Sequence, residues 1–193
     1  MTRCKPVSKI LLLAFFTALL GSAHAQDVVH AVSGVVTNVD KKGKTIAIKA
    51  TDGSEEVFSY SEHTAVRDSR EAAHGARMGV LDTYFAGKQG THVVVRYTGK
   101  GAQKTATLVE DFGKDTLKAG RGTVTGVDRA ARTVTIRTDD GAEATYRLGS
   151  EGVVETDHGV VKASRYVAKE GDKVVVQYTD DTSGKIVRFF KKL

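Results

Sequence analysis

The sequence is poor in the residues that form covalent cross-links or soft-metal sites. Its 193 residues include one cysteine, one proline, two methionines and no tryptophan. Cys4, Pro6 and Met1 all lie near the start, so the chain from residue 26 onward keeps only Met78 of this group. That part of the chain can form neither a disulfide nor a metal–thiolate site, and it carries no cysteine nucleophile. Each folded unit must therefore be held together by its apolar core.

The N-terminus predicts export. Three basic residues precede an apolar run over Ile10–Leu20, and Ala23-His24-Ala25 supplies the small residues that signal peptidase requires at positions −3 and −1. The run is about half of the ~20 residues that a membrane-spanning helix needs. We therefore predict a signal peptide over 1–25 and a periplasmic or secreted protein without a membrane span after cleavage. A retained membrane anchor is the alternative.

The formal net charge of +6 overstates how basic the exported part is. Three of the 29 lysines and arginines precede residue 10, whereas all 23 acidic residues follow the predicted cleavage point. The exported part therefore carries 26 basic residues against 23 acidic ones, a net charge of +3. A charge this small does not indicate nucleic-acid binding.

The chain contains an internal duplication. Gly34–Phe58 aligns without gaps with Gly122–Tyr146, 88 positions later, and 10 of the 25 positions are identical. Val93–Thr98 then matches Val174–Thr179 at an offset of 81, so the first copy carries seven extra residues. We predict a first unit over 26–110, a linker over 111–120 and a second unit over 121–193.

Each copy has the pattern of short strands. Ile46 and Ile48 alternate with Thr45 and Lys49, as expected for a sheet with one buried and one wet face. Asp-Gly pairs follow and suit a tight hairpin turn. We predict five strands in each unit. In the first unit the strands cover about Val32–Val39, Lys44–Ala50, Ser54–Tyr60, Thr91–Thr98 and Lys104–Glu110.

The spacing of valines predicts a bulge in the first strand of each copy. Val36 and Val39 are three residues apart, as are Val124 and Val127, so strict alternation cannot place both members of a pair on one face. The other residues predicted to face the cores are Ile46, Ile48, Val93, Val95, Tyr97, Ala106 and Leu108 in the first unit, and Val134, Ile136, Tyr146, Leu148, Val174, Val176, Tyr178, Val187 and Phe189 in the second.

Five strands leave two unpaired edges unless the sheet closes on itself. We therefore predict an all-β fold of two tandem five-stranded OB-like small barrels, with a sandwich of two small sheets as the alternative. Long insertions separate strands three and four, at Ser61–Gly90 and Gly149–Gly171. Each is expected to hold a loop or a short helix, over Asp68–Ala76 in the first and Ser164–Lys169 in the second.

The repeated motif Gly-x-Val-x-x-Val-Asp, then Lys/Arg-Thr-Ile/Val-x-Ile and Gly-x-x-Val-x-Val-x-Tyr, resembles small exported OB-like barrel domains that occur in tandem in bacterial envelope proteins. It is also distantly similar to the periplasmic Cus-type copper/silver chaperone. That second resemblance implies a copper or silver site made from one histidine, two methionines and one tryptophan. The present chain has no tryptophan, and Met78 lies in an insertion, so the resemblance implies the fold without these ligands.

Two histidines are candidate metal ligands. His74 and His158 each precede a glycine and occupy comparable places in the two insertions, so a duplicated histidine could bind a divalent metal. A polar loop residue is the simpler interpretation. No HxH or HExxH spacing is present, so a metal site would need ligands from distant loops.

The sequence contains two further surface patterns that a ligand could use. The pairs Asp139-Asp140 and Asp180-Asp181 could ligate calcium, but isolated pairs lack the spacing of a calcium loop, and solvated turns are the favoured interpretation. Basic strand residues together with the tyrosines could form a stripe for an anionic or saccharide ligand. The tyrosines share their register with the inward valines, however, which favours a place in the core.

No sequence pattern indicates catalysis. There is no GxSxG elbow, no phosphate-binding loop and no acid–base pair at a recognisable spacing, so we expect neither an enzyme nor a cofactor. The favoured function is an exported, non-enzymatic binding or interaction module of the bacterial envelope. Its expected partner is an envelope or extracellular protein or a saccharide, contacted through the insertions. The alternative is a periplasmic metal-handling accessory protein that uses the loop histidines.

Overall fold

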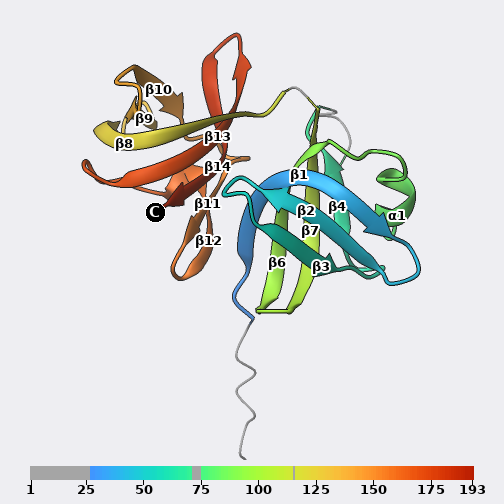
Figure 1. Ribbon diagram of the computed structural model, residues 1–193. Helices are drawn as coiled ribbons and strands as arrows, with labels where there is room; N and C mark the ends of the chain where they lie inside the picture. Colours follow the sequence, from blue (N-terminus) through green and yellow to red (C-terminus); the bar gives the residue numbers. More distant parts are fainter. Residues whose placement is uncertain (1–26, 71–74, 115) are drawn as a thin grey trace, which may run out of the picture.

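The computed structural model describes residues 27–70, 75–114 and 116–193. The predicted signal peptide lies outside the described residues. The described chain is nearly all β, with 59% strand and 4% helix, and forms two closed five-stranded barrels in tandem, each with two extra strands (Figure 1). The predicted fold of two tandem OB-like barrels is confirmed, and the two-sheet sandwich is not formed.

The first barrel closes through a parallel pair. β1 pairs with β2 on one side and with β6 on the other, and β7 meets β3 in parallel where Ser59 lies opposite Thr105. Closure leaves none of the five strands as a long open edge of a flat sheet. The strands are β1 (His30–Asp40), β2 (Thr45–Ala50), β3 (Glu55–Ser59), β6 (His92–Lys100) and β7 (Gln103–Gly113).

The second barrel repeats this order. β8 pairs with β9 and β13, and Tyr146 and Arg147 of β10 close the barrel against β14 in parallel. The duplicated sequence therefore gives a duplicated topology. The strands are β8 (Lys118–Asp128), β9 (Thr133–Thr138), β10 (Glu143–Arg147), β13 (Lys173–Asp181) and β14 (Gly184–Lys192). β7 and β8 thus extend into the range predicted as a linker.

The insertions contain strands as well as helical turns. β4 and β11 pair in parallel with β7 and β14, and each is followed by an antiparallel partner. They cover the part of β7 or β14 that runs past the barrel closure and would otherwise be an open edge. The elements are β4 (Ala65–Asp68), β5 (Arg77–Met78) and α1 (Leu81–Tyr84), then β11 (Val153–Thr156), β12 (Gly159–Lys162) and the 3-10 turn η1 (Ala163–Arg165).

The predicted helix positions in the insertions are wrong. Asp68 ends β4, and the described residues of Asp68–Ala76 are not helical; α1 comes later in the chain. Of Ser164–Lys169, only the first two residues belong to η1. Neither helical segment has a side-chain cap at its N-terminus, so the sequence carried no local signal that marks where it begins.

The predicted bulges are confirmed. The pairing of β1 with β2 shifts register between Val36 and Asn38, and the pairing of β8 with β9 shifts between Val124 and Gly126. The extra residue lets the valine on each side of the bulge reach the same core. The three-residue spacing of the valines, which departs from strict alternation, therefore correctly predicted a β-bulge in each first strand.

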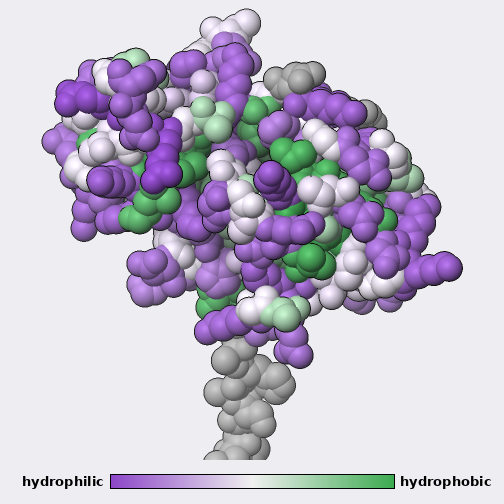
Figure 2. Space-filling view, viewed as in Figure 1, coloured by the Kyte–Doolittle hydropathy of each residue, from purple (hydrophilic) through white to green (hydrophobic). Residues whose placement is uncertain are grey.

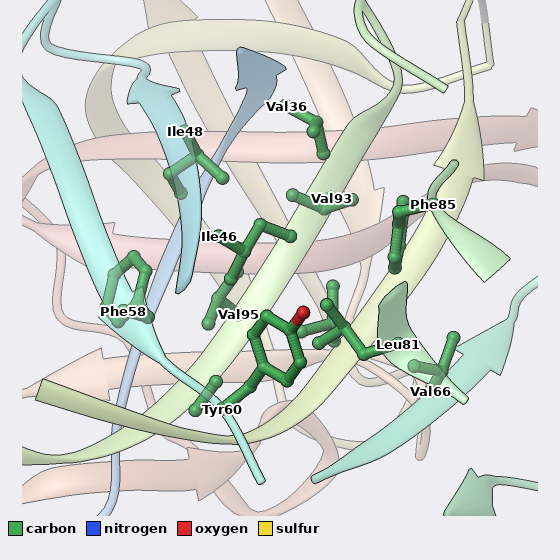
Figure 3. Close-up of a cluster of buried hydrophobic side chains, with 12 residues drawn as sticks. Val36, Ile46, Ile48, Phe58, Tyr60, Val66, Leu81, Phe85, Val93 and Val95 are labelled. Carbon is green, nitrogen blue, oxygen red and sulfur yellow. The ribbon is translucent and has the colours of Figure 1, made fainter. Parts of the chain in front are cut away.

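The predicted barrel cores are also confirmed in most positions. Ile46 and Ile136 are 0% exposed at equivalent places in the two barrels. Figure 3 shows Ile46, Phe58 and Val95 directed into the first core, with Leu81 and Phe85 of the first insertion closing its end. Burial of one such side chain stabilises a fold by about 1.5–3 kcal/mol.

Two predicted core residues face the other way. Leu108 and Phe189 are absent from the barrel cores, and their neighbours Val109 and Phe190 take those places. The cause is a second register shift, in which Thr107 of β7 and Arg188 of β14 are the extra residues opposite β6 and β13. This shift places Phe189 on the outside of the second barrel.

We predict that Ile46→Ala lowers the free energy of unfolding by about 2–5 kcal/mol, because it removes a fully buried side chain and leaves a cavity. Val57→Ala is the matched control, since Val57 is 50% exposed, and its effect should stay within about 0.5 kcal/mol. Urea unfolding of both variants measures the difference. Equal effects of the two substitutions would contradict the assigned core.

Candidate functional site

The outer faces of the two barrels pack against each other. Val94 and Phe112 of the first barrel meet Val153 and Phe189 of the second, and all four side chains are buried. These positions would lie on the surface of an isolated barrel. Their burial fixes the two barrels in contact beside the chain connection. The whole apolar cluster comprises Ala31, Val94, Phe112, Leu117, Val153 and Phe189, with Val160 partly buried against it.

Glu155 of β11 closes the open edge of β1. Its Oε2 accepts a hydrogen bond from the backbone N–H of Ala31 at 2.7 Å, and its Oε1 lies 2.6 Å from Nδ1 of His30. The backbone N–H of Val160 donates to the carbonyl of Val29 at 2.7 Å. Figure 1 shows the hairpin of β11 and β12 reaching down beside the first half of β1. One carboxylate thus satisfies a backbone donor and a side chain of the other barrel.

A second polar contact crosses the interface. The hydroxyl of Ser33 donates to Oε1 of Gln177, and Nε2 of Gln177 donates to Oγ1 of Thr51. Ser33 and Gln177 are buried, at 1% and 4% exposure. A buried amide whose oxygen and nitrogen both have partners fixes the register of the two faces, because any slip would leave one of them unpaired.

Charged residues also link the two barrels. Arg67 lies 3.2 Å from Glu151 of the second barrel and 3.7 Å from Glu110. Glu110 is also 3.8 Å from Arg96, and burial lowers the pKa of Arg96 although Glu110 opposes this shift. Among the described residues, the buried Nε of Arg96 has no hydrogen-bond partner. The group ties β4, β6 and β7 to the loop before β11.

A cleft of about 420 Å³ opens where the two barrels meet. Its walls are apolar: Ala50 and Tyr97 come from the first barrel, and Ala119, Val175 and Phe189 come from the second. Figure 2 shows hydrophobic patches on both barrels within a surface that is mostly hydrophilic. Charged groups of both signs stand around the cleft, namely Asp52, Glu56 and Glu155 together with Arg121 and Lys191.

The groups around Tyr97 are held in place by one another. Lys104 contacts Glu56, and its Nζ lies 5.5 Å from the centre of the Tyr97 ring. The ring of His30 lies 5.8 Å from that of Tyr97. Burial, together with Glu155 and Glu56, raises the pKa of Tyr97, so its hydroxyl keeps its proton at neutral pH and can donate a hydrogen bond.

Asp52 completes the acidic side of the cleft. Its Oδ1 accepts hydrogen bonds from the hydroxyl and the backbone N–H of Ser54, at 2.6 and 3.0 Å. These bonds lower the pKa of Asp52, and the positive charge of Lys191 acts in the same direction. The cleft therefore presents fixed charges beside apolar walls, an arrangement suited to holding a ligand in one orientation.

Another polar cluster lies at the far end of the first barrel. The hydroxyl of Tyr84 is 2.7 Å from a carboxylate oxygen of both Asp68 and Asp111. Arg70 donates to Asp68, and Lys88 lies 3.2 Å from Asp111, so two acids are balanced by two bases. The Arg70 guanidinium holds the pKa of Asp68 well below its usual range, whereas burial raises that of Tyr84. The cluster fastens β4 and α1 to β7.

Only one of the two predicted metal ligands, His158, lies in the part of the chain that the structure describes. His158 is exposed in the turn between β11 and β12, where its backbone N–H donates to Oγ1 of Thr156 at 3.2 Å. His74 lies outside the described residues. Within residues 27–70, 75–114 and 116–193, no three histidine, cysteine or acidic side chains are grouped around a possible metal position. Metal binding through His74 and His158 stays a prediction.

The other surface patterns have structural explanations. Asp181 accepts hydrogen bonds from the backbone N–H and hydroxyl of Ser183, as expected for a solvated turn. Tyr60 and Tyr146 are buried, at 6% and 2% exposure, as the core interpretation expected. Among the tyrosines of the described residues, Tyr97 alone lines the cleft. None of the helices in the described part of the chain is long and apolar enough to cross a membrane.

The cleft could not be predicted from either copy of the sequence alone. Its walls come from strands of both barrels, and no motif in either copy marks them. The only signal lay in a comparison of the two copies, where outward positions differ in charge while inward positions match. Arg67, Arg96 and Glu110 of the first copy, for example, correspond to Glu155, Gln177 and Lys191 of the second.

No protein-family model and no curated protein matches this chain. Among solved structures, a copper(II) complex of a tryptophan-to-alanine variant of CusF from Escherichia coli is 16% identical with a TM-score of 0.33, covering 42% of this chain and 98% of that chain. The silver(I) complex of CusF is 15% identical with a TM-score of 0.32, covering 40% and 97%. These matches agree with the distant resemblance to the Cus-type chaperone and carry no conclusion about function.

We predict that Glu155→Ala lowers the free energy of unfolding by about 1–3 kcal/mol, because the Ala31 N–H and the His30 ring lose their acceptor. Hydrogen exchange of the Ala31 amide should become faster. Glu143→Ala is the control, since it removes a carboxylate from an exposed ion pair with Arg137. If both variants unfold at the same urea concentration, Glu155 does not hold the barrels together.

Proposed function

We propose that this chain is an exported, non-catalytic binding module whose ligand occupies the cleft between the two barrels. One observation carries the proposal. The cleft exists only where the barrels meet, and it combines apolar walls with a few charged groups at fixed positions. Ligand sites in proteins are concave, mostly apolar and often formed between domains, with a small number of polar groups that orient the ligand.

The rigidity of the interface supports this role. The apolar cluster around Phe189 and the hydrogen bonds of Glu155 and Gln177 hold both walls before any ligand arrives. A preformed site loses little conformational entropy on binding, so more of the contact energy contributes to affinity. Tyr97 offers both a flat apolar ring and a protonated hydroxyl on one wall.

The state of the acidic groups supports binding rather than catalysis. Glu155 is held by His30 and the Ala31 N–H, and Glu56 is held by Lys104. Neither carboxylate is presented to a ligand as a free acid or base. The predicted signal peptide supports a place outside the cytoplasm. The contact surface differs from the one expected. Strands supply most of the cleft, and Glu155 is the one lining residue from an insertion within the described part of the chain.

A single-tryptophan reporter tests the proposal, because the chain contains no tryptophan. We predict that the emission of a Tyr97→Trp variant shifts when the purified protein meets a ligand-containing fraction of the envelope, since the indole then lies against the bound ligand. Met78→Trp is the matched control, because Met78 is 56% exposed on β5 and does not line the cleft. Equal responses from both reporters, or none from either, would contradict binding in the cleft.

A further inference from the structure

One edge of β8 lies open in the cleft. Residues Lys118 to Arg121 pair with β13 on one side, whereas the pairing of β9 on the other side begins only at Gly122. Ala119, Gly120 and Arg121 all line the cleft. Within the described residues, no backbone or side-chain hydrogen bond covers this second edge. An open strand edge is a template for another extended chain.

The first barrel shows what such an edge binds. Residues 30 to 33 of β1 correspond to 118 to 121 of β8, and there too the pairing with the next strand begins only at the following glycine, Gly34. In the first barrel this edge is covered. The Ala31 N–H donates to the carboxylate of Glu155, and the Val29 carbonyl accepts from the N–H of Val160. The cover is therefore the hairpin of β11 and β12, which supplies one carboxylate and one backbone N–H, while Thr51 donates to the Ser33 carbonyl.

The equivalent backbone donor of β8 points into the cleft. Ala31 lies opposite Arg96 in the pairing of β1 with β6, and its N–H is directed away from β6 toward Glu155. Ala119 lies opposite Gln177 in the same register, so its N–H is directed away from β13 by the alternation of an antiparallel pair. Ala119 is exposed and lines the cleft.

The surroundings of this edge are more basic than in the first barrel. Lys118 replaces His30, Arg121 replaces Ser33, and Lys191 stands where the first barrel has Glu110. Lys118 lies 2.6 Å from Asp180, and Arg121 lies 3.9 Å from Asp139, but the two basic side chains are 55% and 68% exposed. Lys191 lies opposite Glu155, whose oxygens are engaged by the first barrel. Glu56, which also lines the cleft, is paired with Lys104. The remaining acidic residue of the lining, Asp52, stands against Arg121 and Lys191, and this balance favours an acidic occupant.

A second copy of this chain fits the edge poorly. The hairpin of β4 and β5 corresponds to the hairpin of β11 and β12 that covers β1. In the β4 hairpin, Arg67 stands in the place of Glu155, so it would bring a positive charge toward Arg121 and Lys191. The β11 hairpin, which carries the carboxylate, is already used within the chain.

We propose that an extended acidic peptide segment of a partner protein binds in the cleft by adding a strand to the edge of β8, with a carboxylate accepting a hydrogen bond from the Ala119 N–H. This inference rests on the proposed binding function. Four residues of edge span about 14 Å at the rise of a strand, so a short peptide is sufficient. Alternate side chains of the peptide pack on Val175, which is half-buried and supplies an apolar contact.

The direct test uses a blocked nine-residue peptide of alternating valine and glutamate, with binding followed by the Tyr97→Trp emission. Binding at micromolar concentration is expected, and methylation of alternate peptide nitrogens should weaken it by about tenfold or more because the backbone hydrogen bonds are lost. The same peptide with lysine in place of glutamate should bind at least about tenfold more weakly.

Variants locate the site on β8. Ala119→Pro removes the N–H that points into the cleft and leaves the pairing with β13 intact, so peptide binding should fall by about tenfold or more. Ala119→Val keeps the N–H and should bind within about threefold of the original protein. Arg121→Glu should also weaken binding, whereas Arg137→Glu on β9 should not, because Arg137 does not line the cleft. Circular dichroism and thermal unfolding check that each variant folds.

Three results would overturn the inference: equal binding by Ala119→Pro, equal binding of the methylated peptide, or no binding of the acidic peptide to the original protein. If the acidic peptide does not bind but an envelope fraction still shifts the Tyr97→Trp emission, the binding function stands and strand addition is rejected. No response to either the peptide or the fraction rejects both. Concentration-dependent dimers that Ala119→Pro abolishes would assign the edge to a second copy and likewise reject the partner peptide.

Discussion

The contact between the outer faces of the barrels is the interaction on which the other features depend. Phe189 and Val94 bury apolar surface that each barrel alone would expose to water. Glu155 then satisfies the backbone of β1 at the edge that β2 does not reach. Apolar burial supplies most of the attraction, and the buried hydrogen bonds select one register, because a shifted arrangement would leave polar groups without partners. The cleft is a consequence of that fixed register.

Duplication produced two barrels of one topology, and divergence of their outer faces made them complementary. Inward positions match closely, as Ile46 and Ile136 do. Outward positions changed sign: Arg67 corresponds to Glu155, and Glu110 corresponds to Lys191. The contact is not symmetric, so among the described residues one of the two equivalent strand edges is covered and the other is not. The uncovered edge of β8 lies beside the cleft. The asymmetric contact between the barrels therefore leaves a strand edge accessible at the place where a partner is proposed to bind.

The two insertions serve different purposes despite equal positions. The first is fastened to its own barrel by Tyr84, which lies between the carboxylates of Asp68 and Asp111. The second sends the hairpin of β11 and β12 across to the other barrel, where Glu155 binds. Both begin with a strand that pairs in parallel with the last strand of the barrel. The two insertions therefore share one strand arrangement, but the first stabilises its own barrel whereas the second links the two barrels.

The sequence by itself determined the two barrels, most of their cores and the bulges near Val36 and Val124, because alternation along a strand is a local pattern. The prediction that Leu108 and Phe189 face the barrel cores was wrong, because the register shift beside each of them depends on pairing with another strand. The tertiary structure alone decided β4 and β11, the covered edge of β1 and the whole cleft. These features arise from contacts between residues more than 35 positions apart, and local propensity cannot specify which outer faces of two closed barrels will meet.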